Sequence, residues 1–150
     1  MEAHFYEVNV NWKENRRGTM NSPELNTTIE VATPPQFPKG EAGVWSPEHL
    51  FTAAVSSCLM TTFLAIAENS KLEFTSFDVK SKGKLEVAEG KYLMTEVILE
   101  PVLTIAHGKD TERAGRILQK SEAACLISNS IKSKITMIPT VLVAHEKSLA

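Results

Sequence analysis

The chain has 150 residues, of which 43% are hydrophobic and 23% charged, and its formal net charge is −2. This length suits one domain with a core of its own, so we expect a single domain over residues 1–150. The charge balance argues against a nucleic-acid partner, since phosphate binding usually needs a concentrated basic face. The N-terminus lacks a basic stretch followed by an apolar run, so no secretory signal is expected and we predict a cytoplasmic protein.

The N-terminal third of the chain predicts two strands and a long loop. Residues 5–12 alternate between apolar and polar side chains, which is typical of a half-buried strand. The apolar positions of this alternation are Tyr6, Val8, Val10 and Trp12. Residues 15–18 predict a turn, residues 27–33 predict a second strand, and the Pro- and Gly-rich residues 34–40 predict a loop.

A long helix is predicted from Pro47 to about Asn69. Ser46 suits the N-cap, Pro47 suits the first helical position, and Glu48 complements the positive end of the helix dipole. Residues 50–67 are 18 residues without a charge, near the lower limit for a membrane span. Hydroxyl side chains interrupt this segment and no Lys or Arg cluster flanks it closely, so we interpret it as the central helix of a soluble core with no membrane partner.

The second half of the chain predicts more strands and a second helix. We expect strands at residues 75–87, 92–105 and 135–143, with a turn at Glu89-Gly90. Asp110 can cap a helix over residues 111–124, whose apolar positions fall on one stripe that ends at Cys125. The order of elements, strands then helix then strands then helix then strand, predicts an α+β fold with a mainly antiparallel sheet.

The two cysteines, Cys58 and Cys125, are the candidates for chemistry. Their separation fits neither a zinc pair nor a Cys-x-x-Cys motif, and a structural disulfide is not expected in a reducing cytosol. Cys58 lies in the middle of the long helix, and Cys125 lies at the buried end of the second helix. The residues alone leave open that both are inert thiols packed as small hydrophobic side chains.

A reactive Cys58 would need an activating group, because the effect of a helix N-terminus fades after the first turn. Arg16 and Arg17 are candidates, since a guanidinium is always charged and can bind a peroxide oxygen; the alternative is a solvated turn. Glu48 lies ~15 Å from Cys58 along one helix axis. Glu48 can therefore join a Cys58 site only from a second subunit with an antiparallel helix; otherwise it interacts with the helix dipole.

Three motifs resemble those of the OsmC and organic hydroperoxide resistance family. Residues 46–58, Ser-Pro-Glu-His-Leu-Phe-Thr-Ala-Ala-Val-Ser-Ser-Cys, resemble its Asn-Pro-Glu-x-Leu-x-x-Ala…Cys signature. Residues 123–128, Ala-Ala-Cys-Leu-Ile-Ser, resemble its second cysteine motif, and Trp12 followed by Arg16-Arg17-Gly18 resembles its N-terminal strand and arginine turn. The matches occur in the right order over almost the whole chain.

The resemblance implies an intertwined homodimer with two sites at the interface and a thiol-dependent peroxidase that reduces organic hydroperoxides in defence against oxidative stress. Cys58 would be the peroxidatic thiol and Cys125 the resolving thiol. A pair formed by Glu48 and Arg17, or Arg16, would activate Cys58. An external dithiol, which in the family can be lipoyl-type, would restore both thiols, and no cofactor is expected.

Three aromatic residues, Phe37, Trp45 and Phe51, could give an apolar mouth suited to organic peroxides. His49 is a possible proton donor or a surface residue of the first turn. The histidines lack metal-ligand spacing, so no metal is predicted. The chain has Ser46 where the family often has Asn, and Leu126 where it often has Pro. Two other readings stay open: a non-catalytic module of the same fold that binds an apolar small molecule, and an oligomeric structural protein with inert thiols.

Overall fold

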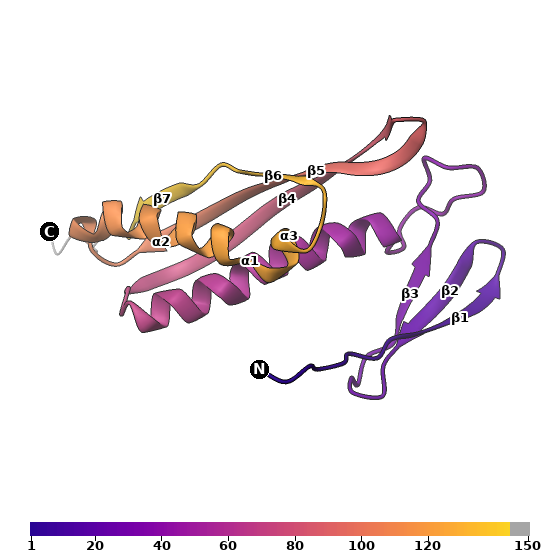
Figure 1. The fold of residues 1–150 in the computed structure, drawn as a ribbon, viewed down its shortest axis with the longest axis horizontal. Helices are drawn as coiled ribbons and strands as arrows, with labels where there is room; N and C mark the ends of the chain where they lie inside the picture. Colours follow the sequence, from indigo (N-terminus) through magenta and orange to yellow (C-terminus); the bar gives the residue numbers. More distant parts are fainter. Residues whose placement is uncertain (145–150) are drawn as a thin grey trace, which may run out of the picture. The chain divides into compact units, whose positions relative to one another are not determined.

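In the computed structural model the chain divides into two compact units, residues 1–50 and residues 51–150. The structure describes residues 1–144. Each unit is described by itself, and the expectation of a single domain over residues 1–150 stays a prediction. The first unit holds a small sheet, and the second holds the helices and a larger sheet (Figure 1).

The sheet of the first unit has three antiparallel strands in the order β1-β2-β3. Their bounds are β1 Asn9–Glu14, β2 Arg17–Asn21 and β3 Ile29–Ala32. The register pairs Val10 with Met20 and Met20 with Ile29, so apolar side chains share one face. Because successive side chains of a strand point to opposite faces, Arg17 lies on the other face of the sheet.

Three sequence predictions are wrong in this unit. Arg17 is the first residue of a strand, and the turn is confined to Asn15 and Arg16. The alternation of polar and apolar residues from Arg17 to Asn21 was the signal for this strand. The N-terminal strand begins later than predicted, at Asn9, and it is exposed along its whole length instead of half-buried. No element within residues 1–50 covers its apolar face, where Trp12 is 76% exposed.

The long helix α1, Pro47–Asn69, has the predicted bounds. At its start the His49 amide donates to Ser46 Oγ at 3.1 Å, so the predicted N-cap is confirmed. At its end Lys71 adopts a left-handed φ of 55°, and the amides of Lys71 and Leu72 donate to carbonyls of the last turn. This pattern is a Schellman motif, which stops the helix before the next strand.

The sheet of the second unit is built on a long hairpin of β4, Phe74–Ala88, and β5, Lys91–Ile105. Glu89 and Gly90 both have positive φ, as a type I′ turn requires, so the predicted turn is confirmed. Two short strands, β6 Lys134–Met137 and β7 Thr140–Val143, pair with β5 in parallel.

The last strand was predicted as one strand over residues 135–143, and the structure divides it in two. Pro139 lies in the break between β6 and β7 and has no amide to donate to a sheet. The Ile138 amide still donates to the Leu99 carbonyl at 2.8 Å, so the chain stays beside β5. The sheet is therefore mixed: antiparallel in the hairpin and parallel at this edge.

The second helix, α2, spans Thr111–Ala124 as predicted and buries the expected stripe. A 3-10 turn, η1, at Gly108–Asp110 leads into it. Asp110 occupies the N-cap position, but its side chain makes no capping hydrogen bond. Its carboxylate pairs with Arg113 at 3.4 Å instead, so the predicted capping role is wrong. A four-residue helix, α3, Leu126–Asn129, follows Cys125 directly.

Helices α1 and α2 pack against the same face of β5, and Phe63 of α1 lies at the centre of this core. Its ring stacks on the Phe77 ring with 4.3 Å between the ring centroids, and it contacts the Phe74 ring edge-on with 5.2 Å between the centroids. Around it lie buried residues of both helices, of β5 and of the turn after α1, namely Ala67, Leu72, Leu103, Ile105, Ala114, Ile117 and Leu118. A second cluster, Val55, Leu59, Val97 and Leu99, continues this core along α1. The packing fixes the rotation of α1 and therefore which of its side chains face α2.

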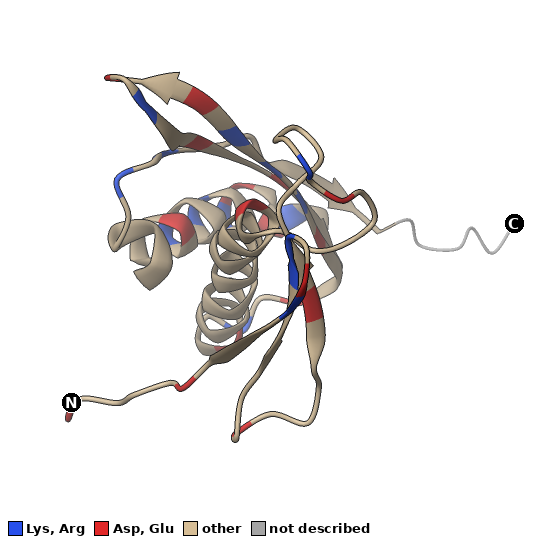
Figure 2. Cartoon of the chain, turned by 90° about the vertical axis from the view of Figure 1, so that its right-hand side faces the viewer, with Lys and Arg blue, Asp and Glu red and all other residues tan. Residues whose placement is uncertain are grey.

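One helix among the described residues, α1, is long and apolar enough to cross a membrane by length and composition, a test that core helices of soluble proteins also pass. The helix is nearly free of charge, whereas basic and acidic side chains are interspersed along β4 and β5 (Figure 2). Lysines 80 and 84 of β4, for example, lie opposite Glu100 and Glu96 of β5.

Gly83 lets α1 approach the sheet closely. A Cβ at this position would overlap the Thr52 hydroxyl and come within 2.7 Å of Met94 Cε. We expect Gly83→Ala to lower the free energy of unfolding by about 1–3 kcal/mol, the usual effect of overpacking. Chemical denaturation measures this change.

The matched control is Gly115→Ala, because a Cβ at Gly115 in α2 would meet nothing within 4 Å. This substitution should raise the free energy of unfolding by roughly 0.5–1 kcal/mol through helix propensity. Equal stabilities of Gly83→Ala and the unsubstituted protein would contradict the close approach of α1 to β4.

Candidate active site

Cys58 lies on the edge of the buried stripe of α1. Its neighbour Leu59 points into the core, and Cys58 itself is 9% exposed. The sulfur lies 3.9 Å from the hydroxyl of Thr62, one turn further along the helix. Cys58 is thus nearly buried, with a small exposed surface.

Cys125 lies where α2 ends and α3 begins. Its backbone leaves the helical region, with φ −65° and ψ 113°, and its side chain is fully buried. The two thiols interact, because Cys125 lowers the pKa of Cys58 and Cys58 raises the pKa of Cys125. Both cysteines are free thiols, so the structure holds the reduced form of the pair. Two residues far apart in sequence are therefore brought together by the packing of α2 beside α1.

The surroundings of Cys58 favour its thiolate. Burial raises the pKa of Cys58, but hydrogen bonds from the Cys125 thiol, the Ile127 amide, the Thr62 hydroxyl and the Leu126 amide outweigh this effect. The net result is a pKa below the ordinary value of a cysteine. Because the thiolate is the reactive form of cysteine, the lowered pKa favours Cys58 as the nucleophile of the pair.

The surroundings of Cys125 favour its neutral thiol. Burial raises the pKa of Cys125, and its contact with Cys58 raises it further. The hydroxyl and amide of Ser128 act in the opposite direction without reversing the shift. Ser128 is itself buried, so this contact lies inside the protein. The pair is therefore asymmetric, with a proton held on Cys125 and negative charge favoured on Cys58.

Arg17 lies in the first unit and is held by two carboxylates. Its guanidinium pairs with Glu41 at 2.7 Å and with Glu30 at 3.4 Å. The hydrogen bond with Glu41 raises the pKa of Arg17 above its ordinary value. Within the described residues these carboxylates, and not Glu48, are its ion-pair partners. The sequence analysis missed both of them, since one lies in a strand and the other after the proline-rich loop.

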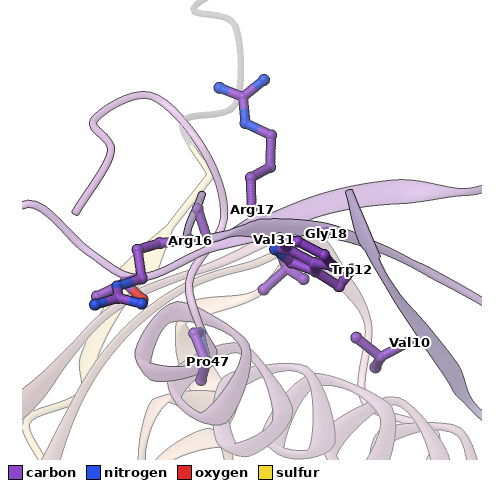
Figure 3. Close-up of a pocket in the computed structure, with 9 residues that line it drawn as sticks. Val10, Trp12, Arg16, Arg17, Gly18, Val31 and Pro47 are labelled. Atoms are coloured by element: carbon purple, nitrogen blue, oxygen red, sulfur yellow. The ribbon is translucent and has the colours of Figure 1, made fainter. Parts of the chain in front are cut away.

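Arg16 and Arg17 are adjacent but point in different directions (Figure 3). Arg17 extends to the opposite side of the strand from Trp12 and Val31, whereas Arg16 lies in the exposed turn before β2. Both line a cavity of about 310 Å³ whose other walls are mainly apolar. The remaining lining residues are Val10, Trp12, Gly18, Val31, Ala32, Thr33 and Pro47.

The other predicted site residues lie near the start of α1. Glu48 is half-buried in the first turn. His49 makes a 2.6 Å hydrogen bond with Ser46 Oγ and an edge-on ring contact with Trp45, so it supports the N-cap. Trp45 is 51% exposed, as an apolar mouth would require. Phe51, in contrast, packs against the second core cluster.

Phe37 is half-buried in the proline-rich loop, where its amide donates to the Pro34 carbonyl at 3.1 Å. Within residues 1–144 no three His, Cys, Asp or Glu side chains lie close enough to hold a metal ion. His145, the last of the four histidines considered for metal binding, lies outside the described residues.

The fold and the paired cysteines define a protein of the OsmC-like class. The sequence pattern of that family, described as OsmC-like protein, matches residues 40–139, and the chain belongs to this family. The predicted resemblance and the predicted α+β architecture are confirmed.

Two curated relatives are similar to the chain over much of its length. The uncharacterized protein YmaD of Bacillus subtilis (strain 168) is 28% identical over 141 residues, which cover 91% of each chain. Peroxiredoxin OsmC of Escherichia coli (strain K12) is 26% identical over 99 residues, which cover 66% of this chain and 68% of the relative. The family therefore includes a named peroxiredoxin.

Solved structures share the fold. An OsmC-like protein of unknown function from Vibrio cholerae superposes with a TM-score of 0.82 at 22% identity, covering 91% of this chain and 99% of the other. An organic hydroperoxide resistance protein OsmC from Legionella pneumophila gives a TM-score of 0.74 at 20% identity, with coverage of 95% and 100%.

The asymmetry of the cysteine pair generates a prediction about labelling. In the reduced native protein Cys58 should be alkylated faster than Cys125 near neutral pH, because its pKa is lowered while that of Cys125 is raised. Peptide mass spectrometry after timed exposure to iodoacetamide measures both rates. The Cys58→Ser protein serves as the control for the Cys125 rate, and equal, slow labelling of both thiols would contradict an activated Cys58.

Proposed function

We propose that this protein is a thiol peroxidase that reduces organic hydroperoxides to alcohols, with Cys58 as the attacking thiol and Cys125 as the resolving thiol. The observation that carries the proposal is the interacting pair of buried free thiols, one with a lowered and one with a raised pKa. Membership in a family with a named peroxiredoxin supports the same reaction class.

The proposed reaction begins with the Cys58 thiolate, which attacks one oxygen of the hydroperoxide. A sulfur–oxygen bond forms, the oxygen–oxygen bond breaks, and the alkoxide takes a proton and leaves as the alcohol. Cys58 becomes a sulfenic acid, oxidised by two electrons. Cys125 then attacks this sulfur, a disulfide forms and water leaves. An external dithiol returns two electrons by exchange, and we propose a lipoyl-type dithiol in the cytoplasm as its source.

The position of Cys125 supports a resolving role. The two buried thiols influence each other's pKa, so Cys125 lies near the sulfur with which it would form the disulfide. Its proton, held in the reduced state, passes to the hydroxide that leaves the sulfenic acid. Burial of both sulfurs also limits the access of further peroxide, which would otherwise over-oxidise Cys58.

Arg17 or Arg16 would bind the peroxide oxygens, and a carboxylate would hold the arginine in place. The ion pair of Arg17 with Glu41 gives it a fixed position, whereas Arg16 has no ion-pair partner within residues 1–144 and could pair with Glu48. The apolar cavity beside both arginines and the exposed ring of Trp45 suit an organic substrate better than hydrogen peroxide.

The proposed assembly is an intertwined homodimer. Apolar side chains of α1 are left uncovered within the single chain, with Met60 41% and Leu64 42% exposed, and the apolar face of β1 is uncovered as well. Uncovered apolar surface on a soluble chain favours association. A second copy related by a two-fold axis would cover both surfaces and could bring its Glu48 to Cys58.

The apolar cavity also favours a second candidate, a non-catalytic module that binds an apolar small molecule. Peroxide consumption separates the two functions. The proposed peroxidase consumes an organic hydroperoxide with a dithiol, and Cys58→Ser abolishes this activity. A binding module consumes none but retains its ligand with either residue at position 58.

A disulfide between the two cysteines should form on oxidation. One equivalent of organic hydroperoxide should yield an intramolecular Cys58–Cys125 cross-link, seen by mass spectrometry of a non-reduced digest. Cys125→Ser should give over-oxidised Cys58 instead. If the unsubstituted protein also gives only over-oxidised Cys58, then Cys125 is not the resolving thiol.

The dimer predicts complementation between two inactive subunits. Glu48→Gln and Cys58→Ser chains, unfolded together and refolded, should regain activity, because one of the two sites in a heterodimer contains both residues. Each variant refolded alone is the control, and native mass spectrometry verifies the heterodimer. If a verified heterodimer stays inactive, Glu48 does not act on Cys58 across the interface. If light scattering shows a monomer, the dimer itself is rejected.

A further inference from the structure

The first unit contains a second cavity, to which the proposed peroxidase reaction gives no role. This polar cavity has a volume of about 510 Å³ and is lined by Asn15, Arg16, Lys39 and Glu41. All four side chains are polar, and two of them carry a positive charge. The lining contrasts with the mainly apolar walls of the cavity of about 310 Å³, with which the polar cavity shares Arg16.

Hydrogen bonds join the two walls of the polar cavity. Thr33 lies between them, because its amide donates to the Arg16 carbonyl at 3.3 Å and its carbonyl accepts from the Glu41 amide at 2.9 Å. The Trp12 indole donates to the Asn15 carbonyl at 3.1 Å, which anchors the turn on β1. The turn before β2 and the proline-rich loop are therefore fixed relative to each other.

The loop that carries Lys39 is closed by its own hydrogen bonds. The Phe37 amide donates to the Pro34 carbonyl at 3.1 Å, and the Gly40 amide donates to the Phe37 carbonyl at 3.0 Å. A Cβ at Gly40 would overlap the Pro34 carbonyl, so this path of the loop requires glycine. Lys39 has a left-handed φ of 63°, which is uncommon for a residue with a side chain. Such conformations persist where the surrounding structure imposes them, and they are frequent at binding sites.

The charges around the polar cavity favour an anion. Arg16 and Lys39 form no ion pair within the described part of the chain. The Glu41 carboxylate pairs with Arg17 at 2.7 Å, so the charge of Arg17 offsets that of Glu41. Two cations beside one cavity repel each other, and an anion between them offsets this repulsion. A guanidinium matches the two oxygens of a carboxylate or phosphate, and Asn15 adds an amide donor.

We propose that the polar cavity binds a small organic molecule through its oxyanion group, a carboxylate or a phosphate, held by Arg16 and Lys39. A volume of about 510 Å³ is typical of ligand pockets and exceeds the needs of a bare ion. The site goes beyond the proposed function, because its ligand need not react with Cys58. Arg17, held by Glu41, then remains for the peroxide, and Arg16, which points in a different direction (Figure 3), binds the organic anion.

The test is a ligand titration of the reduced, unsubstituted protein, without peroxide, followed in ¹⁵N–¹H spectra. The backbone amides of Lys39 and Glu41 are the reporters, because these residues line the polar cavity and are not among those that line the apolar cavity. Benzoate or phenyl phosphate should shift both signals to saturation, and the tighter of the two identifies the carboxylate or the phosphate as the bound group. Neutral benzamide should give no saturable shift.

Three outcomes of this titration would overturn the proposal. The first is the absence of a saturable shift with either anion, and the second is an equal shift with benzamide. The third is inorganic phosphate that binds as tightly as phenyl phosphate, because the cavity would then not hold the organic part of a ligand.

Charge-removing variants locate the site. Lys39→Gln and Arg16→Gln should each weaken binding of the anion about three- to fivefold, the loss expected for one partly exposed ion pair. The matched control is Lys13→Gln, which removes the same charge from β1 at a residue that is not among those lining the polar cavity. Unchanged binding in both Lys39→Gln and Arg16→Gln, or equal weakening in Lys13→Gln, would refute the site.

The site and the proposed function fail separately. Cys58→Ser should bind the anion as the unsubstituted protein does. If the anion binds but the protein consumes no hydroperoxide, the peroxidase proposal fails and the anion site stands. If the protein is an active peroxidase and neither anion binds, the anion site alone fails.

Discussion

The interaction between the thiols of Cys58 and Cys125 is the one on which the proposed chemistry of this chain depends. It exists because α1 and α2 pack on one face of β5, with Phe63 and its aromatic neighbours fixing the rotation of α1. Gly83 allows the close approach of α1 to the sheet. A small rotation of either helix would separate the sulfurs, so the core is also the support of the cysteine pair.

The pair is asymmetric because the two sulfurs meet different donors. The pKa of Cys58 is lowered by hydrogen bonds from a thiol, two amides and a hydroxyl. Cys125 is more deeply buried, and apart from burial its pKa is affected mainly by Cys58 and Ser128. Burial alone would raise both pKa values and make two inert thiols. The hydrogen bonds that lower the pKa of Cys58 reverse that effect at one sulfur only, which suits the two thiols to different roles in the proposed reaction.

In the first unit, ion pairs hold an arginine side chain in a fixed position. Arg17 is held by Glu41 and Glu30 on the polar face of a small sheet, while the opposite face leaves Trp12 and Val10 exposed. A strand with an uncovered apolar face is poorly stabilised by its own chain. The same holds for Met60 and Leu64 of α1, which is why a second copy is the proposed cover.

Local signals in the sequence determined the helices, the long hairpin and the family. Ser46-Pro47 marked the start of α1, Glu89-Gly90 marked the hairpin turn, and the motifs around Cys58 and Cys125 carried the resemblance. These features depend on neighbours in the chain, through caps, turn conformations and periodicity, so they can be predicted from sequence.

Contacts between residues that are far apart in the sequence became visible only in the tertiary structure. The pairing of Arg17 with Glu41 and the parallel edge strands beside β5 depend on contacts between segments that no local pattern links. The pKa of Cys58 depends in part on the backbone amides of Leu126 and Ile127, groups that every non-proline residue possesses. The identity of the side chains could not indicate this effect of the amides, because the effect depends on where the turn after Cys125 places the backbone.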